Sequence, residues 1–420
     1  MSSSERRRQF GLYLASLRSA ARQSQRQLAS CLCAVSGTHS VTRSEVSRWE
    51  RGGRIPEVWL PWLAQLLRVP VAEMNQAAAY ARGEQWAQLP SPVASLRALL
   101  PGGDLVERGA AAKAGRRIGA EDVSRLATKV HALRLADDVL AGGDLIGPAF
   151  RQLRSALDVY RDGVFTEATG RDLLVQIAEL GQITGWVASD AGRLDDAERA
   201  YRIGLDAARQ AGDAPMTAHL AGSLAYQWSN NGREVDGVGL AEAALRESGD
   251  QVPAAARALF CDRVAWAYAR LDGAESAQAA QRALGEAHSA LDHGDGPPAP
   301  AWAYWVSHEE LAIMDARVFT ELRRPLRAVP LLNDVLGRYD STHAREAALY
   351  RSWLAVALAD AREPEQAAAE ARAIIALAGD LTSARTAERT RVVLRRLMEY
   401  DSVPEVGAVL RDYGYLLHTS

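Results

Sequence analysis

Residues Leu173–Asp213 read LLVQIAELGQITGWVASDAGRLDDAERAYRIGLDAARQAGD and predict two amphipathic helices joined by a short turn at Gly192. Apolar residues recur three or four positions apart on both sides of this turn, which is the spacing of helices with one buried face. Gly181 and Gly185 lie on the buried face of the first helix, and small residues there let a second helix approach closely. The stretch therefore predicts an antiparallel helix pair.

The same arrangement repeats along the chain. Gly232 and Gly273 follow Gly192 at intervals of 40 and 41 residues, each inside a further pair of amphipathic segments. A period of about 34 to 42 residues with two helices per unit is typical of a helical solenoid. We expect six or seven pairs, with a break at His293–Pro300 that forms a loop or a hinge. Their approximate bounds are 122–160, 165–212, 214–249, 252–292, 301–339, 342–379 and 383–417.

The unit at 173–213 resembles a tetratricopeptide repeat (TPR) through Leu180-Gly181, Gly185-Trp186, Gly192, Ala197 and Tyr201. The other units match less well. The resemblance implies a TPR-like α-solenoid over 121–420, with a groove lined by the first helix of each pair. Several unusual residues fall on that surface by their helical phase, where Asn can hold a peptide backbone and Arg a carboxylate. The candidate ligand-binding residues are Gln182, Trp186, His219, Tyr226, Asn230, Arg263 and Arg270.

A cluster of aromatic residues, Trp302, Tyr304 and Trp305, is predicted on the first helix of the fifth pair. Aromatic residues at helical spacing form part of a core or line a pocket, and the sequence leaves both readings open.

Charge is distributed unevenly along the 420 residues. The net charge is −3, and 48% of the residues are hydrophobic, as in a globular protein. Residues 1–86, however, hold 12 arginines against 6 glutamates, which leaves −9 for the remainder. A basic module on an acidic body indicates a polyanionic partner for the front of the chain. Between the two, 87–120 is rich in Pro and Gly and predicts a connector, in which Lys113, Arg116 and Arg117 are either phosphate contacts or solvated.

The basic module has the pattern of five short helices. Phe10, Tyr13, Leu14 and Leu17 have helical spacing, and Ser24 is a good N-cap for a second helix. Thr42 followed by Glu45 has the capping-box pattern for a third helix, which buries Val46 and Trp49. A fourth helix follows Pro56, and a short fifth follows Val71.

Residues 10–75 resemble the helix-turn-helix domain of the Cro/CI (XRE-type) repressors. The resemblance rests on Ser24-Gln25, Leu28-Ala29, Val46-Ser47, Trp49-Glu50-Arg51-Gly52 and Pro56 in this order and spacing. It implies double-stranded DNA as a partner, with the third helix in the major groove. The segment from Cys33 to Val41 is longer than the usual turn of about three to four residues.

The resemblance also assigns the individual contacts. Arg43 and Ser44, and then Arg48, match the positions that read base edges, where Arg suits guanine. Glu45 accepts from cytosine or acts only as a cap partner, and both roles stay open. Arg18 and Glu50 match an internal ion pair, with a phosphate contact by Arg18 as the alternative. The complete set of candidate DNA-binding residues is Gln25, Arg26, Thr42, Arg43, Ser44, Glu45, Ser47, Arg48, Arg51 and Arg54.

Several other classes of protein are disfavoured. The sequence lacks a zincin H-E-x-x-H motif, a P-loop and G-x-S-x-G and G-x-G-x-x-G motifs, so we expect neither an enzyme nor a cofactor. Three cysteines, Cys31, Cys33 and Cys261, predict packing residues in a reduced compartment rather than disulfides or a zinc site. No apolar run reaches the length of a membrane span, and no signal peptide is evident, so we expect a cytoplasmic protein.

The two modules together resemble bacterial quorum-sensing regulators, in which an XRE-type domain precedes a peptide-binding TPR domain, and actinobacterial XRE–TPR regulators. This resemblance implies a homodimeric transcriptional regulator on a palindromic operator, controlled by a peptide or small molecule in the TPR groove. The alternative is a ligand-independent repressor, or a scaffold whose body binds a protein partner.

Overall fold

The computed structural model shows that the described part of the chain is helical and contains no strand, which confirms the all-α expectation. It describes residues 3–21, 23–38, 40–67, 69, 71–84, 96–100, 105–108, 116–137, 140, 142–249, 252–293, 297–338, 344–378 and 384–418. The chain divides into two compact units, Met1–Gly102 (unit 1) and Gly103–Ser420 (unit 2), and each is described by itself.

Unit 1 contains the five helices expected for its front part, packed around one core. Each of the five contributes a fully buried side chain: Leu14, Leu28, Val46, Leu63 and Met74. The elements are α1 (Ser3–Ala20), α2 (Gln25–Ser36), α3 (Arg43–Glu50), the 3-10 turn η1 (Glu57–Trp59), α4 (Leu60–Leu66), α5 (Val71–Arg82) and the short α6 (Leu96–Leu99).

The connection between α2 and α3 is shorter than the sequence suggested. The predicted segment began at Cys33, but α2 continues to Ser36, where Gly37 ends it in the left-handed conformation with φ 69°. Gly37 has no Cβ to oppose that conformation, so it is the natural place for the helix to stop. The connection therefore spans 37–42. Cys33 remains inside the helix, and its thiol donates to the Val41 carbonyl oxygen at 3.3 Å.

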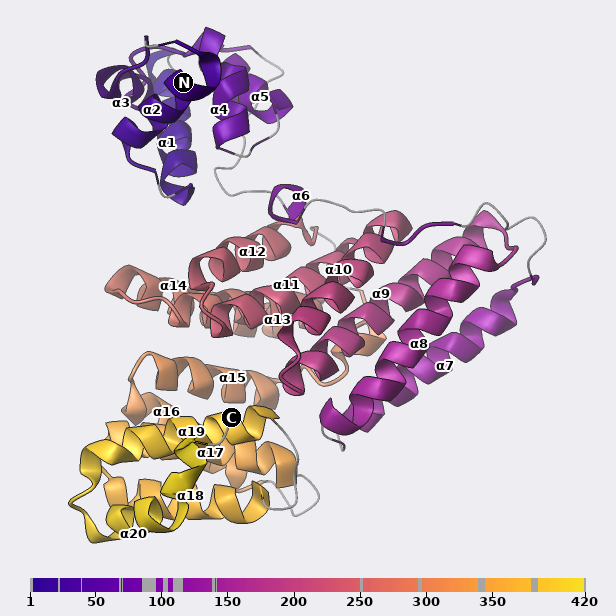
Figure 1. Ribbon diagram of the computed structural model, residues 1–420, viewed down its shortest axis with the longest axis vertical. Helices are drawn as coiled ribbons and strands as arrows, with labels where there is room; N and C mark the ends of the chain where they lie inside the picture. Colours follow the sequence, from indigo (N-terminus) through magenta and orange to yellow (C-terminus); the bar gives the residue numbers. More distant parts are fainter. Residues whose placement is uncertain are drawn as a thin grey trace. The chain divides into compact units, whose positions relative to one another are not determined.

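Unit 2 consists of seven antiparallel helix pairs among the described residues (Figure 1). In each pair the first helix is called A and the second B. The pairs are α7 (Ala120–Asp137) and α8 (Gly142–Asp162), α9 (Glu167–Asp190) and α10 (Leu194–Ala211), α11 (Ala214–Asn230) and α12 (Glu234–Glu247), α13 (Ala254–Ala269) and α14 (Ala274–Asp292), α15 (His308–Glu321) and α16 (Pro325–Leu336), α17 (Ala344–Asp360) and α18 (Pro364–Ala378), and α19 (Ala384–Leu397) and α20 (Pro404–Tyr413).

Successive pairs stack in a regular order. Each A helix contacts its own B helix and the next A helix, and each B helix contacts the A helix that follows it. Close packing within a pair depends on small residues. A Cβ on Gly181 of α9 would lie 2.6 Å from the Cα of Gly204 on α10, closer than any real contact. This nearest-neighbour order is that of a helical solenoid.

The turn between A and B helices has one recurring backbone feature. The predicted turn glycines Gly192, Gly232 and Gly273 all have positive φ, at 74°, 77° and 114°. Gly192 and Gly232 lie two residues after the end of their A helix, and in two later pairs an arginine takes that place: Arg323 has φ 51° and Arg362 has φ 64°. The same turn conformation therefore occurs in pairs whose sequence has no glycine at this position.

The fifth pair differs from the expectation in one respect. Trp302, Tyr304 and Trp305 were predicted on its A helix, but Trp302 lies in the 3-10 turn η3 (Ala301–Ala303), and the other two follow it. Helix α15 begins only at His308, because the hydroxyl of Ser307 caps it by accepting from the Glu310 amide. Pro300 holds the chain extended before η3. The three aromatic residues therefore belong to an inter-repeat segment.

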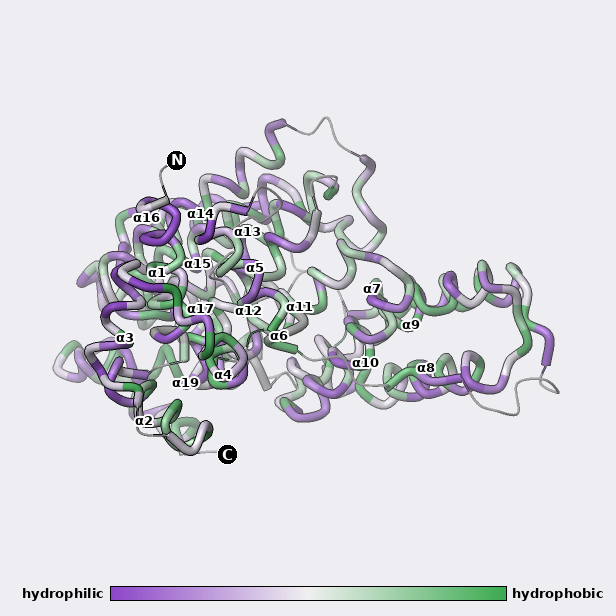
Figure 2. Tube along the Cα trace, turned by 90° about the horizontal axis from the view of Figure 1, so that it is seen from above, coloured by the Kyte–Doolittle hydropathy of each residue, from purple (hydrophilic) through white to green (hydrophobic). Residues whose placement is uncertain are grey.

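Most of the predicted connector, including Lys113, lies outside the described residues. Of its described part, Arg116 pairs with Asp122 at 2.7 Å, and Arg117 forms a lone β-bridge with Val164. Figure 2 shows hydrophobic and hydrophilic residues alternating along individual helices. In the described ranges, no helix is both long and apolar enough to cross a bilayer.

Changing Arg323 to Gly should stabilise unit 2. A non-glycine residue in the left-handed region costs about 1–2 kcal/mol, and the greater freedom of glycine in the unfolded chain offsets part of the gain. We expect a net gain of about 0.5 kcal/mol in the free energy of unfolding, measured by urea denaturation. Arg323→Ala is the matched control, because it removes the same side chain and keeps the strain. An Ala variant as stable as the Gly variant would contradict this explanation.

Candidate nucleic-acid interface and ligand cavities

Helix α3 presents a polar face opposite its buried one. Val46 and Trp49 are buried in the core of unit 1, whereas Arg43, Ser44 and Arg48 are exposed. Arg43 forms no ion pair with any described residue, and Arg48 has only a long contact of 3.9 Å with Glu45. The guanidinium groups at the start and middle of this face are therefore available to a partner.

A buried carboxylate fixes the other end of α3. Arg18 on α1 donates to both oxygens of Glu50, from Nε at 2.5 Å and from Nη2 at 3.2 Å. Gln25 on α2 donates to the same carboxylate at 2.7 Å. The side chains of Arg18 and Glu50 are only 16% and 7% exposed. The expected internal ion pair is confirmed, and it ties α1, α2 and α3 together.

The remaining predicted contact residues lie near α3 or at the start of α2. Arg26, Thr42, Arg51 and Arg54 are exposed, and Ser47 and Gln25 are half-buried. Since Gln25 already donates to Glu50, one hydrogen of its amide group remains for another acceptor. The Thr42 hydroxyl accepts from the Glu45 amide at 3.3 Å, which is one half of the expected capping box.

The Glu45 carboxylate lies 3.9 Å from Arg48, and its role toward a base stays a prediction. A complete capping box occurs instead at Ser24 and Gln27, at the start of α2.

Unit 2 contains two adjoining cavities lined mainly by A helices. The first, of about 230 Å³, is called the His219 cavity, and the second, of about 360 Å³, the Trp353 cavity. Trp186 and Arg317 are among the residues that line both. All seven predicted ligand-binding residues line one or both cavities: Gln182, His219 and Arg263 the first, Tyr226, Asn230 and Arg270 the second, and Trp186 both.

The His219 cavity has a floor of stacked rings. The imidazole of His219 lies on the indole of Trp302, with centroids 4.2 Å apart and planes within 8°. Tyr304 and Trp305 also line this cavity, and Trp302, only 4% exposed, belongs to the buried core as well. Burial holds the pKa of His219 well below its usual value of 6.5, and the charges of Arg134 and Arg263 lower it further. His219 is therefore neutral at neutral pH.

Arginines and aromatic rings alternate in the Trp353 cavity. The guanidinium of Arg317 lies 4.7 Å from the ring centre of Trp266, and that of Arg389 lies 3.4 Å from that of Trp353. The Trp266 and Trp353 rings meet edge to face at 5.5 Å. Such cation–π contacts hold a cation without neutralising its charge.

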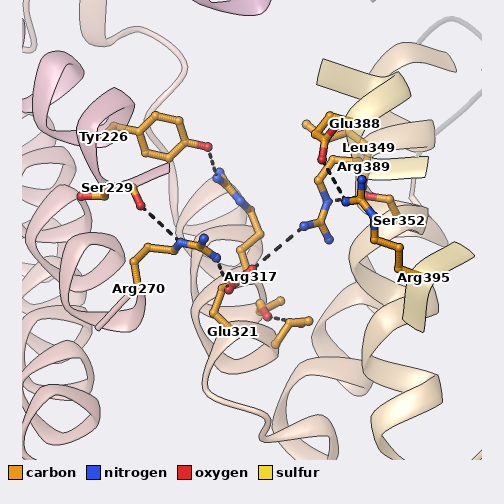
Figure 3. Close-up of polar contacts among 12 residues, drawn as sticks. Tyr226, Ser229, Arg270, Arg317, Glu321, Leu349, Ser352, Glu388, Arg389 and Arg395 are labelled. Carbon is orange, nitrogen blue, oxygen red and sulfur yellow. Dashed lines mark hydrogen bonds and ion pairs between the residues drawn. The ribbon is translucent and has the colours of Figure 1, made fainter. Parts of the chain in front are cut away.

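Polar contacts join five A helices around this cavity (Figure 3). Arg317 on α15 donates to the Tyr226 hydroxyl on α11 at 2.5 Å. Glu321 on α15 accepts from Arg270 on α13 at 2.5 Å and lies 4.0 Å from Arg389 on α19. Arg389 also donates to the hydroxyl of Ser352 on α17 at 3.2 Å. The cavity is thus built from residues far apart in the sequence.

Sequence reasoning missed Trp266, Arg317, Trp353 and Arg389. A usable signal was present for Arg317. Trp186 and Tyr226 each precede the positive-φ turn glycine of their pair by six residues, and Arg317 precedes Arg323 by six. Because the turn residue there is arginine rather than glycine, the register of the fifth pair was hidden.

Replacing Arg18 with Met should destabilise unit 1. Glu50 would remain buried without its cation, which costs about 3 kcal/mol. We expect hydrogen exchange of the α3 amides to accelerate about 30-fold or more. The double variant Arg18→Met/Glu50→Gln should recover much of the protection, because the unpaired charge is gone. Unchanged exchange combined with weaker DNA binding would instead identify Arg18 as a phosphate contact.

Replacing His219 with Phe should flatten the pH dependence of stability. The unfolded chain protonates this histidine near pH 6.5, whereas the folded chain does so only at lower pH. Stability therefore falls as pH drops below 6.5. Phenylalanine keeps the stacking but cannot titrate. Between pH 7.5 and 5.5 we therefore expect the variant to lose about 1 kcal/mol less of its free energy of unfolding than the wild type loses. Urea denaturation of both proteins at both pH values measures this, and equal losses would contradict it.

Comparison with known proteins gives one family match. Residues 9–77 match a family described as a helix-turn-helix domain. No match was found among curated proteins. The matched residues include α2 and α3 in full, together with the Arg18–Glu50 pair that holds them. The front of this chain is therefore a helix-turn-helix domain, the kind of module that DNA-binding regulators carry.

Proposed function

We propose that the protein is a transcriptional regulator that reads a specific DNA sequence with α3. The observation that carries this proposal is the exposed, unpaired guanidinium of Arg43 at the start of a helix whose back is buried and whose end is fixed by Glu50. A rigid helix with donors at its N-terminal end is what major-groove recognition requires. The family match over 9–77 supports the same reading.

The proposed contacts divide into two groups. Arg43, Ser44 and Arg48 read base edges, with arginine donating to the two acceptors of guanine. Glu45 either accepts from cytosine or orients Arg48. Phosphate contacts set the register of the domain on the duplex and carry no sequence information themselves. The proposed phosphate contacts are Gln25, Arg26, Thr42, Ser47, Arg51 and Arg54.

We infer that two copies act together on a palindromic operator. One recognition helix reads too few base pairs to be selective, whereas two related by a two-fold axis read half-sites separated by a helical turn or a multiple of it. In this proposal residues 1–86 bind DNA, 87–120 connect, and 121–420 bind an effector and pair the two copies. The seven-pair array of unit 2 supports this role, because solenoids supply extended surfaces for binding.

The effector in this proposal is a signalling peptide or a small molecule held in the two cavities of unit 2. A ligand that binds one arrangement of the array better than another shifts the population of DNA-competent dimers. A tenfold change in DNA affinity requires only about 1.4 kcal/mol of differential binding. DNA binding that responds to no extract of the source cells would favour the alternative, a ligand-independent repressor or a scaffold for a protein partner.

The double variant Arg43→Ala/Arg48→Ala should lose specific DNA binding. Each good arginine–guanine pair is worth about 1–3 kcal/mol, so we expect affinity for the selected operator to fall about 100-fold or more. The operator is first selected from genomic fragments with the full-length protein. Fluorescence anisotropy then measures its affinity and stoichiometry, which should be two chains per palindrome.

The matched control is Arg125→Ala/Arg161→Ala, which removes the same charge from exposed arginines in unit 2. It should bind the operator as the wild type does. Affinity should also fall with salt, with a log–log slope near −0.9 per phosphate neutralised. Unchanged binding by the α3 variant would refute the contact assignment.

A further inference from the structure

The Trp353 cavity contains buried hydrogen-bond donors that the protein does not satisfy. Among the described residues, the indole nitrogens of Trp266 and Trp353, Nε of Arg317 and one terminal nitrogen of Arg389 have no acceptor. Trp266 and Trp353 are only 3% and 4% exposed. Leaving a buried donor unpaired costs about 1–3 kcal/mol, so native structures rarely do so without a reason. Unpaired acceptors among the described residues of the same wall, such as the amide oxygen of Gln227, are fewer than these donors. The excess of donors indicates a ligand that supplies acceptors.

The surroundings of the Arg317 and Arg389 side chains also indicate a ligand that supplies acceptors. Arg317 forms no ion pair with any described residue, and its one described hydrogen bond is to the neutral hydroxyl of Tyr226. Arg389 is 14% exposed, and its nearest carboxylate, Glu321, lies 4.0 Å away and already bonds Arg270 at 2.5 Å. Burial lowers the pKa of Arg389 to about 10; the carboxylate of Glu321 opposes this shift and the charge of Arg317 adds to it. The Arg389 guanidinium stays charged at neutral pH. Among the described residues, Glu321 is the one carboxylate within 4.0 Å of either guanidinium. Asp190 and Glu388 also line the cavity, and Glu388 is 55% exposed and pairs with Arg391 and Arg395.

The rest of the wall is partly apolar. Leu194, Leu349 and Val392 line the cavity together with the rings of Trp186 and Tyr226. The other lining side chains are polar or acidic: Ser189, Asp190, Gln227, Asn230, Asn231 and Glu388. Its volume of about 360 Å³ lies at the small end of the range for ligand sites, which hold small molecules or the end of a longer one. A ligand that fits has one anionic group and an apolar body.

We propose that the Trp353 cavity binds the carboxylate of an apolar organic acid, held between Arg317 and Arg389 and completed by the indole N–H groups of Trp266 and Trp353. The inference names the chemical class of the effector, and in that respect it rests on the proposed function. A carboxylate has two oxygens with about four acceptor positions, which suits two guanidiniums and two indole donors.

A single negative charge matches this site better than a double one. Arg270, Arg317 and Arg389 line the cavity together with three acids, Asp190, Glu321 and Glu388. A dianionic phosphate monoester would add its second charge beside these acids, where like charges repel. A neutral amide accepts through one oxygen and donates through its nitrogen, so it would leave donors of the cavity unpaired. The carboxylate comes from a free acid or from the C-terminus of a short peptide, and the experiment separates these sources.

The experiment measures binding by the full-length protein without DNA. Isothermal titration tests a panel at constant ionic strength: indole-3-acetate, phenylacetate and octanoate as carboxylates, indole-3-acetamide as the neutral analogue, and phenyl phosphate as the dianion. A tripeptide ending in leucine is tested with a free and an amidated C-terminus. We expect carboxylates to bind at least tenfold more tightly than the amide and the phosphate. The peptide becomes the preferred source if it binds more tightly than every free acid and loses that affinity on amidation.

Two variants locate the site. Arg317→Met and Arg389→Met should each weaken carboxylate binding at least tenfold, and Arg317→Lys, which keeps the charge, should weaken it less. The exposed, paired Arg171→Met is the control and should leave binding unchanged.

The proposal is overturned if no carboxylate in the panel binds, if the amide or phosphate binds as well, or if the arginine variants bind as the wild type does. Because these titrations contain no DNA, such a failure leaves operator binding by α3 intact. A failure of operator binding in the Arg43/Arg48 experiment likewise leaves the titration result standing. The two proposals therefore fail separately.

Discussion

The close approach of paired helices at small residues determines how unit 2 is built. Gly181 and Gly204 meet so closely that neither position tolerates a side chain. Alanines dominate the same interfaces in the other pairs, as in α11, α13 and α17. The ring of Tyr201 fits between α9 and α10 because Gly185 opposite it has no side chain; a Cβ there would lie 2.5 Å from the ring. Other rings and guanidinium groups, among them Trp266, Arg317 and Trp353, line the cavities instead. Packing between helices thus determines where the chemistry of the unit can occur.

Both units use a buried carboxylate to join helices, with different results. Glu50 in unit 1 receives hydrogen bonds from Arg18 and Gln25, so all of its local charge is matched. Glu321 in unit 2 bonds Arg270 and lies at the limit of an ion pair with Arg389, while Arg317 next to it pairs with no described acid. A matched network stabilises a fixed orientation, as α3 needs. A network that leaves buried donors unpaired suits a site that is completed by a ligand.

The sequence predicted the all-helical class, the five front helices and six or seven helix pairs, because apolar periodicity, caps and turn glycines act locally. It also identified Arg18–Glu50, through a family pattern rather than through chemistry visible in the residues. The sequence prediction was wrong where a residue departs from the usual preference of its position. Arg323 occupies a turn position that favours glycine, which concealed the register of α15 and therefore Arg317. The position of Trp302 depended on a proline and a serine cap that together delay the helix, and periodicity alone gives no sign of that.

The contact between Tyr226 and Arg317 has a mechanical consequence. In a solenoid each repeat touches only its neighbours, so a force applied at the ends peels repeats off one at a time. Tyr226 and Arg317 are 91 residues apart and belong to A helices that are not consecutive. Their hydrogen bond, together with the bridge from Arg270 to Glu321, acts as a clamp across the array. Peeling that begins at α20 would first break the contacts of Arg389 on α19 with Ser352 and Glu321, and would then meet the clamp that holds α15 to α11 and α13.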